Sequence, residues 1–369
     1  MLRNGGLFLR LNARRFAIGA LVLAFGVLLS TARADAQSSD WTGAQDSNWL
    51  NSNNWTNGVP TGDTLIDTVT PNQAVLKGPA GIVTLLDVGE LGTGQLTIAN
   101  GGNLGGVNAV IGGGAGSAGT VTVDGAGSIW SLAGVRIGIN GIGNLVVQNG
   151  GTVLNSTDST IAQNAGSIGL ATVDGPGSTW TISGTLFLGI AGAATLTVNN
   201  GGIVSATSIQ AGGSNASLNI GAAVGQAAAA PGVLDTPTVR LTSSADAIVF
   251  NHTSDNYIFA PTILGSGSVD VRAGTTIFSA NSSYSGATTV NGGALIVNGS
   301  IASSSTLVNS GGTLGGSGIV GNTSINGGTL APGSATGTLT VQGNLSFTAA
   351  STYMVEVSPS SVQKVSSVR

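Results

Sequence analysis

The chain of 369 residues contains no cysteine and a single histidine, His252. Without cysteine it has no disulfide scaffold and no cysteine-ligated metal or cluster. One histidine does not supply the several imidazoles of a histidine-based zinc site. Charged residues make up only 7% of the chain and aromatic residues only 4%. The composition therefore argues against most metalloenzyme classes before any motif is considered.

Basic residues are scarce as well. The chain has 11 Lys and Arg against 15 Asp and Glu, a net charge of −4. Five of the arginines and only one acid lie in residues 1–36, so the remainder is distinctly more acidic than the whole. A protein that binds nucleic acid gathers positive charge to meet the phosphates. Nucleic-acid binding is therefore disfavoured.

Glycine is the abundant residue, with 61 copies. Each glycine inside a helix costs roughly 0.5–1 kcal/mol relative to alanine, so long helices and helical bundles are excluded. The hydrophobic fraction of 41% and the small net charge are nevertheless unlike those of a disordered chain. We expect a folded protein without long helices.

The N-terminus has the pattern of a secretory signal peptide. Four arginines precede residue 16, and the apolar run FAIGALVLAFGVLL follows from Phe16 to Leu29. Small residues then offer cleavage after Ala34 or Ala36, and we favour Ala36 because a polar segment begins at Gln37. The alternative, an uncleaved anchor, needs about 20 apolar residues. Two adjacent arginines fit a twin-arginine signal poorly, so general secretion is preferred.

Internal repeats predict the architecture. VTVDGAGSIWSL at 121–132 returns as ATVDGPGSTWTI at 171–182, 50 residues later. GQLTIANGGNL, GNLVVQNGGTV and ATLTVNNGGIV, at 94–104, 143–153 and 194–204, each place an alternating apolar strand before Asn-Gly-Gly. Asn and Gly adopt the positive φ angles that sharp corners need. Each unit therefore contains strand, corner and strand, and the repeat is typical of a solenoid.

The fold class expected is all-β, a right-handed parallel β-helix behind a signal peptide. One coil of a solenoid takes roughly 20–25 residues, which makes the 50-residue unit about two coils, with three smaller coils as the other possibility. An antiparallel β-sandwich or a propeller is the alternative architecture, but regular hairpin spacing and a four-strand blade signature are both missing.

The second half carries shorter units and a family resemblance. The segments YSGATTVNGGAL from Tyr284, SGGTLGGSGIVG from Ser310, GGTLAPG from Gly327 and GTLTVQGNLSF from Gly337 resemble the passenger-associated repeats of bacterial autotransporters. The tryptophan-rich segment from Trp41 is similar to the opening of many passenger domains. FNHTSDNYIFAPTILGSGSVDV from Phe250 resembles the lead-in to the repeats. The likeness covers nearly all of residues 40–357.

The resemblance implies an exported passenger and divides the chain into six parts. These are a signal peptide (1–36), a Trp-rich N-terminal cap (37–87), a β-helix with 50-residue repeats (88–220), an irregular junction (221–262), passenger-associated repeats (263–357) and a tail (358–369). Autotransporters also carry a C-terminal outer-membrane barrel. Only a short segment follows Val357, far less than the many ten-residue strands of such a barrel, so we expect this sequence to lack it.

Two equivalent aspartates are the first candidates for chemistry. Asp124 and Asp174 would lie about 10 Å apart if stacked two coils apart, close to the carboxylate separation of an inverting glycosidase. Each, however, begins an Asp-Gly-x-Gly-Ser corner, where its side chain can bond the turn backbone. We favour the turn role. Lys77, Arg136, Arg240 and Arg272 are scattered in sequence and form no cluster with the acids.

His252 and the tryptophans are the remaining candidates. His252 with Asp255 formally permits a serine-protease triad, but no nucleophile motif is present, and we interpret it as a polar residue at a strand edge. Trp41, Trp49 and Trp55 either stack on sugars or cover the first coil, and capping is favoured because the end of a solenoid exposes apolar edges. Trp130 and Trp180, one per repeat, are expected to pack in the interior.

The sequence thus predicts a noncatalytic β-helix displayed at the bacterial surface for adhesion or interaction. No catalytic, cofactor-binding or metal-binding residue is assigned, and the expected partner is a host or environmental surface ligand, protein or carbohydrate. The mature chain is expected to have no membrane span and to be periplasmic if no barrel follows. The alternative is a secreted polysaccharide-acting enzyme on the same scaffold, with carboxylates that meet only in the folded coil.

Overall fold

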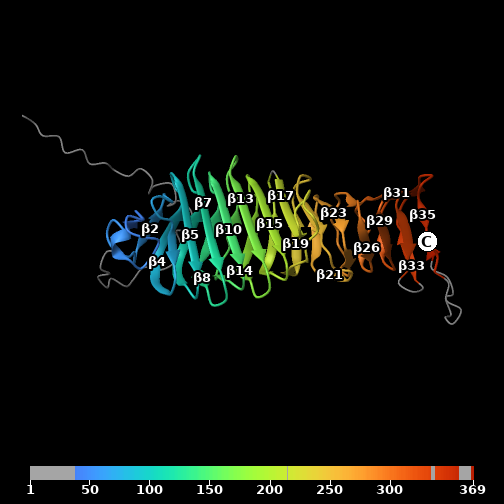
Figure 1. Cartoon of the computed structure of the whole chain (residues 1–369). Helices are drawn as coiled ribbons and strands as arrows, with labels where there is room; N and C mark the ends of the chain where they lie inside the picture. Colours follow the sequence, from blue (N-terminus) through green and yellow to red (C-terminus); the bar gives the residue numbers. More distant parts are fainter. Residues whose placement is uncertain (1–37, 214, 334–336, 357–366) are drawn as a thin grey trace, which may run out of the picture. The chain divides into compact units, whose positions relative to one another are not determined.

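A computed structural model describes residues 38–213, 215–333, 337–356 and 367–369. The signal peptide proposed for residues 1–36 lies outside these residues. The chain from Ala36 to Arg369 is one compact unit. Its strands form two sheets of thirteen strands, one of six and one of four, and the single described helix is the short 3-10 turn η2 (Ser52–Asn54). Figure 1 shows these strands stacked coil upon coil.

One sheet, here called the long sheet, receives a strand from every coil. It consists of β3 (Ala74–Leu76), β5 (Thr93–Ala99), β7 (Ala118–Asp124), β10 (Ile142–Gln148), β13 (Ile168–Asp174), β15 (Ala193–Asn199), β17 (Asn215–Gly221), β20 (Ala247–Asn251), β23 (Ser268–Ala273), β25 (Thr288–Val290), β28 (Thr306–Asn309), β31 (Thr323–Asn326) and β34 (Leu345–Phe347). Its neighbouring strands pair in parallel.

The N-terminal sheet covers the other side of the first coils. It consists of β1 (Ser39–Asp40), β2 (Asp63–Ile66), β4 (Pro79–Val88), β6 (Asn103–Ile111), β8 (Ile129–Leu132), β9 (Gly134–Ile137), β11 (Thr152–Asn155), β12 (Ser159–Ile161), β14 (Thr179–Leu188), β16 (Ile203–Ala211), β18 (Val233–Asp235), β19 (Thr238–Leu241) and β22 (Thr262–Gly265).

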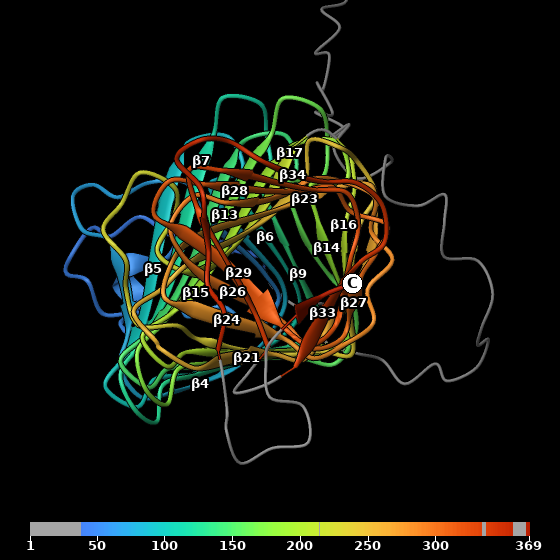
Figure 2. The same ribbon diagram turned by 90° about the vertical axis from the view of Figure 1, so that its right-hand side faces the viewer.

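Two smaller sheets replace the N-terminal sheet in the later coils. The third sheet consists of β21 (Tyr257–Phe259), β24 (Thr275–Phe278), β26 (Gly293–Val297), β29 (Gly312–Gly316), β32 (Thr329–Pro332) and β35 (Thr352–Tyr353). The fourth consists of β27 (Ser300–Ile301), β30 (Ile319–Val320), β33 (Thr338–Val341) and β36 (Ser367–Val368). Later coils therefore have three short sides, which surround the interior in Figure 2.

The strand register confirms the parallel β-solenoid and the two-coil repeat. Ile142 pairs with Ala118 on one side and Ile168 on the other, so these coils take 24 and 26 residues and one 50-residue unit makes two coils. The later coils are shorter, as expected. Thr306 pairs with Thr288 and Thr323, which are 18 and 17 residues away.

The period-two alternation places one side of each strand in the interior. On β10, Leu145 and Val147 are fully buried, while Asn144 and Val146, which alternate with them, are partly exposed. Equivalent aliphatic residues stack in columns from coil to coil, for example Val123, Val147 and Val173. Burying each such side chain contributes about 1.5–3 kcal/mol, an upper estimate because unfolded chains also bury some surface. These columns form one continuous core along the stack.

The Asn-Gly-Gly corners follow the prediction at two of their three positions. Asn149 and Gly150 have φ angles of 55° and 88°, and the two other corners repeat this pattern. The third residue needs glycine for a different reason. A Cβ on Gly151 would lie 2.3 Å from the carbonyl oxygen of Val123 in the preceding coil. Backbone from two coils meets here, and no side chain fits between them.

The strands continue through residues 221–262, the proposed junction, where the cross-section changes. β18, β19 and β22 extend the N-terminal sheet, while β21 begins the third sheet. Aromatic rings fill the interior at this point. Phe250 lies 5.1 Å from Phe259 and 5.6 Å from Phe278 between ring centroids. Larger side chains thus occupy the core where two strand arrangements meet.

We predict that Gly151→Ala destabilises the solenoid, because its Cβ has no space against the Val123 backbone. Overpacking of this kind typically costs about 1–3 kcal/mol. Thermal unfolding followed by circular dichroism should show a lower midpoint than the parent chain. Gly81→Ala is the matched control, since a Cβ there meets nothing within 4 Å. Equal midpoints for the two variants would contradict this account of the corner.

Candidate functional site

A shallow groove crosses the N-terminal sheet where its strands bend. The bend separates β8 from β9 and β11 from β12, and shifts the pairing of β14 with β16 between Ile182 and Thr185. The groove has a volume of about 610 Å³. It is lined by Gly106, Val107, Ser131, Leu132, Ala133, Leu154, Asn155, Ser156, Thr181 and Ser183.

The groove lining combines aliphatic and hydroxyl groups and contains no ionisable side chain. Val107 and Leu154 are 45% and 41% exposed, so the groove presents aliphatic surface to solvent. A neutral surface of this composition suits contact with an uncharged ligand surface and contains no acid–base pair. Sequence reasoning missed the groove because it arises from the bend, and the bend has no distinct residue motif.

The outer face of the long sheet is a second extended surface. Six coils, from β5 to β17, place two rows of uncharged side chains there: Gln95, Thr97, Thr120, Thr122, Asn144, Val146, Leu170, Thr172, Thr195, Thr197 and Ser217. The neighbouring row on the same side contains the carboxylates of Asp124 and Asp174. We call the two uncharged rows the threonine face. Successive coils repeat it at the strand spacing of about 4.8 Å.

The three N-terminal tryptophans are interior residues. Trp41, Trp49 and Trp55 are 3%, 0% and 5% exposed. Their rings pack edge to face, with centroids 4.9 Å apart for Trp41 and Trp55 and 4.7 Å apart for Trp49 and Trp55. The Trp55 indole donates a hydrogen bond to the carbonyl of Trp49 over 2.7 Å. This arrangement leaves no broad indole face to stack on a sugar.

Trp130 and Trp180 pack in the interior, as predicted. Val153 lies between them in the register, so the three side chains form part of one column. Both tryptophans are almost completely buried. The Trp180 indole donates to Asn155 Oδ1 over 2.6 Å, which satisfies the polar end of its ring.

Asp124 and Asp174 occupy equivalent positions two coils apart, with Gln148 between them. Each carboxylate accepts a hydrogen bond from the asparagine of the next corner. Asn149 donates to Asp124 over 2.7 Å, and Asn200 donates to Asp174 over 2.6 Å. Both aspartates are therefore held in contacts between coils.

The predicted role of these aspartates in closing their own turns was wrong. The corner serine performs it: the Ser128 hydroxyl donates to the carbonyl of Asp124 over 2.7 Å, and Ser178 repeats the bond to Asp174 over 2.6 Å. Serine reaches the carbonyl four residues back because the turn folds the chain there. The carboxylates instead point toward the amides of the following coil.

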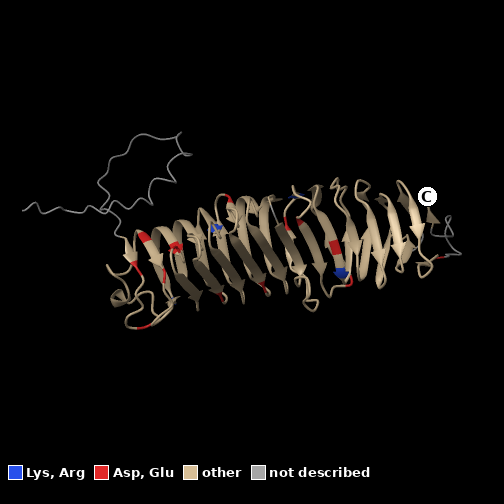
Figure 3. Ribbon diagram, turned by 90° about the horizontal axis from the view of Figure 1, so that it is seen from above, with Lys and Arg blue, Asp and Glu red and all other residues tan. Residues whose placement is uncertain are grey.

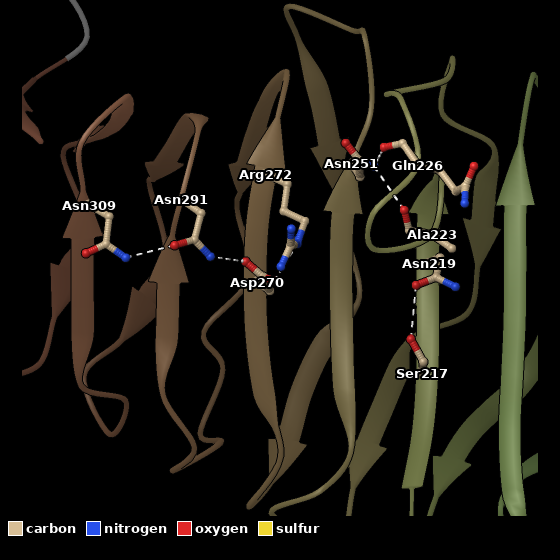
Figure 4. A network of polar contacts seen from close by, with 9 residues as sticks. All are labelled: Ser217, Asn219, Ala223, Gln226, Asn251, Asp270, Arg272, Asn291 and Asn309. Carbon is tan, nitrogen blue, oxygen red and sulfur yellow. Dashed lines mark hydrogen bonds and ion pairs between the residues drawn. The ribbon is translucent and has the colours of Figure 1, made fainter.

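Later coils carry a corresponding ladder of amides, shown in part in Figure 4. Asn291 donates to Asp270 over 2.8 Å, Asn309 donates to Asn291 over 2.8 Å, and Asn326 donates to Asn309 over 3.1 Å. Arg272 forms an ion pair with Asp270 over 2.7 Å. Polar groups along this edge are used to join neighbouring coils.

His252 directly follows the last residue of β20 and is completely buried. Its Nε2 lies 2.9 Å from the hydroxyl of Thr276, and its ring centroid lies 5.1 Å from that of Tyr257. Burial lowers the pKa of His252, an effect that a backbone contact with Ser254 opposes. Asp255 is exposed, and the hydrogen-bond partner of the imidazole is Thr276 instead. The structure does not assemble a triad here.

The few cations are dispersed over the described coils (Figure 3). Arg136 lies on β9 and Arg240 on β19, several coils apart. Arg272 is paired with Asp270, and Lys77 follows β3. Within the described ranges, no group of three or more His, Asp and Glu side chains is arranged to hold a metal ion. In the same part of the chain no helix is long and apolar enough to cross a membrane.

An acidic cluster near the cap was not foreseen from the sequence. Asp87 on β4 is partly buried, and Asp63, Asp67 and Glu90 lie around it. Burial raises the pKa of Asp87 to about 7, and repulsion from Glu90, Asp63 and Asp67 adds to this shift. The Asp67 carboxylate accepts hydrogen bonds from the backbone N–H groups of Glu90 and Leu91. Asp63 and Asp67 lie in one coil and Asp87 and Glu90 in the next, and the pairing of β2 with β4 brings the two pairs together.

Comparison with known proteins does not assign the chain to a family. No family model matches it, and no curated protein matches its sequence. A solved structure, the TibC-catalyzed hyper-glycosylated TibA fragment 55–350, is similar at 19% identity and a TM-score of 0.32. The match covers 79% of this chain and 99% of that one. Similarity at this level supports no inference about a ligand or an activity.

We predict that the stability of the first coils falls as pH rises through about 7. Protonated Asp87 is favoured in the folded state because its pKa is raised there from the ordinary value of 3.8 to about 7. Its stabilising contribution is therefore complete below pH 4 and is lost as the pH passes 7. Asp87→Asn should raise the thermal midpoint at pH 8 and change it little at pH 4.

The exposed residue Asp255 provides the control for this measurement. Asp255→Asn should leave the difference between the midpoints at pH 4 and pH 8 as it is in the parent chain. If Asp87→Asn has the same pH dependence as the parent, the cluster does not control the stability of these coils.

Proposed function

We propose that this protein is an exported, noncatalytic β-helix that uses its lateral surfaces for adhesion or interaction at the bacterial surface. The observation that carries the proposal is the neutral groove across β6, β8, β11 and β14, where aliphatic and hydroxyl groups are exposed together without an ionisable side chain. Such a surface provides contact area and hydrogen bonds and lacks the acid and base of a hydrolase.

Two further observations support the proposal. The threonine face repeats uncharged side chains, most of them hydroxyl or amide groups, over six coils, so that weak contacts can add along an extended ligand. Residues 263–357 resemble the passenger-associated repeats of autotransporters in sequence. On this proposal, residues 1–36 direct export, residues 37–87 cap the solenoid, and the partner is a protein or carbohydrate on a host or environmental surface.

The groove is tested with a substitution that introduces charge at its exposed wall. Fluorescent beads coated with the protein are applied to arrays of neutral and acidic glycans and of extracellular proteins. Some spots should retain beads coated with the parent protein. On these spots, Leu154→Arg should reduce the number of retained beads at least tenfold, because it places a cation in a neutral groove.

Leu307→Arg is the matched control, since Leu307 is a similarly exposed leucine on the long sheet, outside the groove. This variant should bind like the parent. Equal binding by the Leu154→Arg variant and the parent would show that the groove is not the contact surface. Absence of retention on every spot would count against adhesion itself.

The acidic cluster is the observation that favours the second candidate, a polysaccharide-acting enzyme. A carboxyl group whose pKa is raised to about 7 is suited to general acid catalysis, and Asp87 has other carboxylates beside it. The cluster contains no residue of the groove, however. We therefore keep it as the alternative.

Release of reducing sugars from a panel of polysaccharides at pH 5–7 separates the two functions. The adhesion proposal predicts no release above the background of heat-denatured protein. Activity that disappears in Asp87→Asn, with an unchanged circular dichroism spectrum, would instead establish the enzyme.

A further inference from the structure

An alanine-rich loop leaves the solenoid between β17 and β18. It consists of residues 222–232, with the sequence AAVGQAAAAPG, and four consecutive residues within it, 224–227, are exposed. Among the other described residues up to Gly333, exposed runs are at most three residues long. Exposed loops with small side chains are the usual sites of proteolytic nicking. An endopeptidase therefore meets more exposed chain here than at any other described corner before Gly333.

Both ends of the loop are held by the backbone of a neighbouring coil. At its start, the N–H of Ala222 donates to the carbonyl oxygen of Asn251 over 2.9 Å. Further along, the N–H of Thr253 donates to the carbonyl oxygen of Ala229 over 3.0 Å. Residues 223–228 form the segment between these two anchors.

One side chain provides most of the contacts of this middle segment. The Asn251 amide donates to the carbonyl oxygens of Ala223 over 3.2 Å and Gln226 over 3.0 Å, as Figure 4 shows. Among the described residues, the other hydrogen bond of the segment is local, from the N–H of Gln226 to the carbonyl of Ala223 over 3.2 Å. No residue of 223–228 belongs to the buried core. Opening of this segment therefore breaks few hydrogen bonds and exposes no core residue.

The side chains of the loop match one class of endopeptidase. Residues 222–230 are alanines with one Val, one Gly and one Gln, and none is basic or aromatic. An S1 pocket that is small and apolar accepts Ala or Val before the cleaved bond. Val224 is 51% exposed and is followed by glycine, so the bond between Val224 and Gly225 is the most suitable one.

The coils on the two sides of the loop are joined independently of it. β17, before the loop, pairs with β20, after it, from Ser217–Ala247 to Gly221–Asn251. β16, also before the loop, pairs with both β18 and β19. Ile220 and Phe250 are equivalent in this register and are completely buried. A break within the loop therefore leaves the strand pairing and the core in place.

We propose that residues 223–228 are a processing site for an endopeptidase with a small apolar S1 pocket, that Asn251 limits access to it, and that the cleaved chain remains one solenoid of two fragments. Hydrolysis at Val224–Gly225 adds one water. The C–N bond breaks, the carbonyl carbon of Val224 takes the water oxygen and becomes a carboxylate, and the nitrogen of Gly225 becomes an amine. The loop contains no residue of the groove, so this site is independent of the ligand that the groove binds.

Limited digestion of the full chain with pancreatic elastase, whose S1 pocket is small, tests the proposal. Mass spectrometry should place the first cut between residues 38 and 333 within 223–228. Val107 provides an internal control, because it is 45% exposed but lies within β6, and the bond after it should stay intact. The two fragments should elute together on size-exclusion chromatography and separate in guanidinium chloride. A first cut elsewhere in that range, or fragments that separate without denaturant, would overturn the proposal.

A second digestion tests the role of Asn251. Asn251→Ala should raise the rate of cleavage within 223–228 at least fivefold, because the loop loses the amide that holds two of its carbonyls. Asn309→Ala is the matched control, since Asn309 is an amide of the same sheet that bonds Asn291 and not the loop. Its rate should equal that of the parent. Equal rates for the two variants, both folded by circular dichroism, would contradict control of the site by Asn251.

Discussion

The parallel register between successive coils is the constraint on which the rest of the structure depends. Hydrogen bonding at about 4.8 Å per strand brings each residue directly over its equivalent in the next coil. Aliphatic residues then stack on aliphatic residues, as Val123, Val147 and Val173 do, and amides stack on carboxylates, as Gln148 does on Asp124. The same register leaves no room for a side chain at Gly151. The close stacking of coils therefore explains both the packing of the core and the need for glycine at this corner.

The sequence was sufficient to predict the solenoid because its strongest signals are local and repeated. The 50-residue repeat gave two coils, the period-two alternation identified the buried side of each strand, and Asn-Gly gave corners with positive φ. Trp130 and Trp180 were assigned to the core on position alone, and the structure confirms their burial. Each of these inferences required only neighbouring residues and a fixed interval.

Features that depend on contacts between unlike coils were not predictable in this way. Asp63, Asp67, Asp87 and Glu90 belong to no repeated motif, and the raised pKa of Asp87 requires the burial that only the folded coil provides. The sequence predicts a polar position for His252, but its ring lies among aromatic rings where the strand arrangement changes. The groove follows from a bend in the N-terminal sheet. Residues that line it, such as Ser131 and Thr181, are ordinary strand residues with no motif that marks the bend.

The equivalence of Asp124 and Asp174 also bears on how such a chain changes length during evolution. Both aspartates begin the same corner in the same sheet, and two complete coils separate them. Recombination between the DNA encoding these corners would insert or remove two coils while preserving the strand register on both sides. The extent of the lateral surfaces can therefore vary in steps of about 10 Å, with neither end of the stack redesigned.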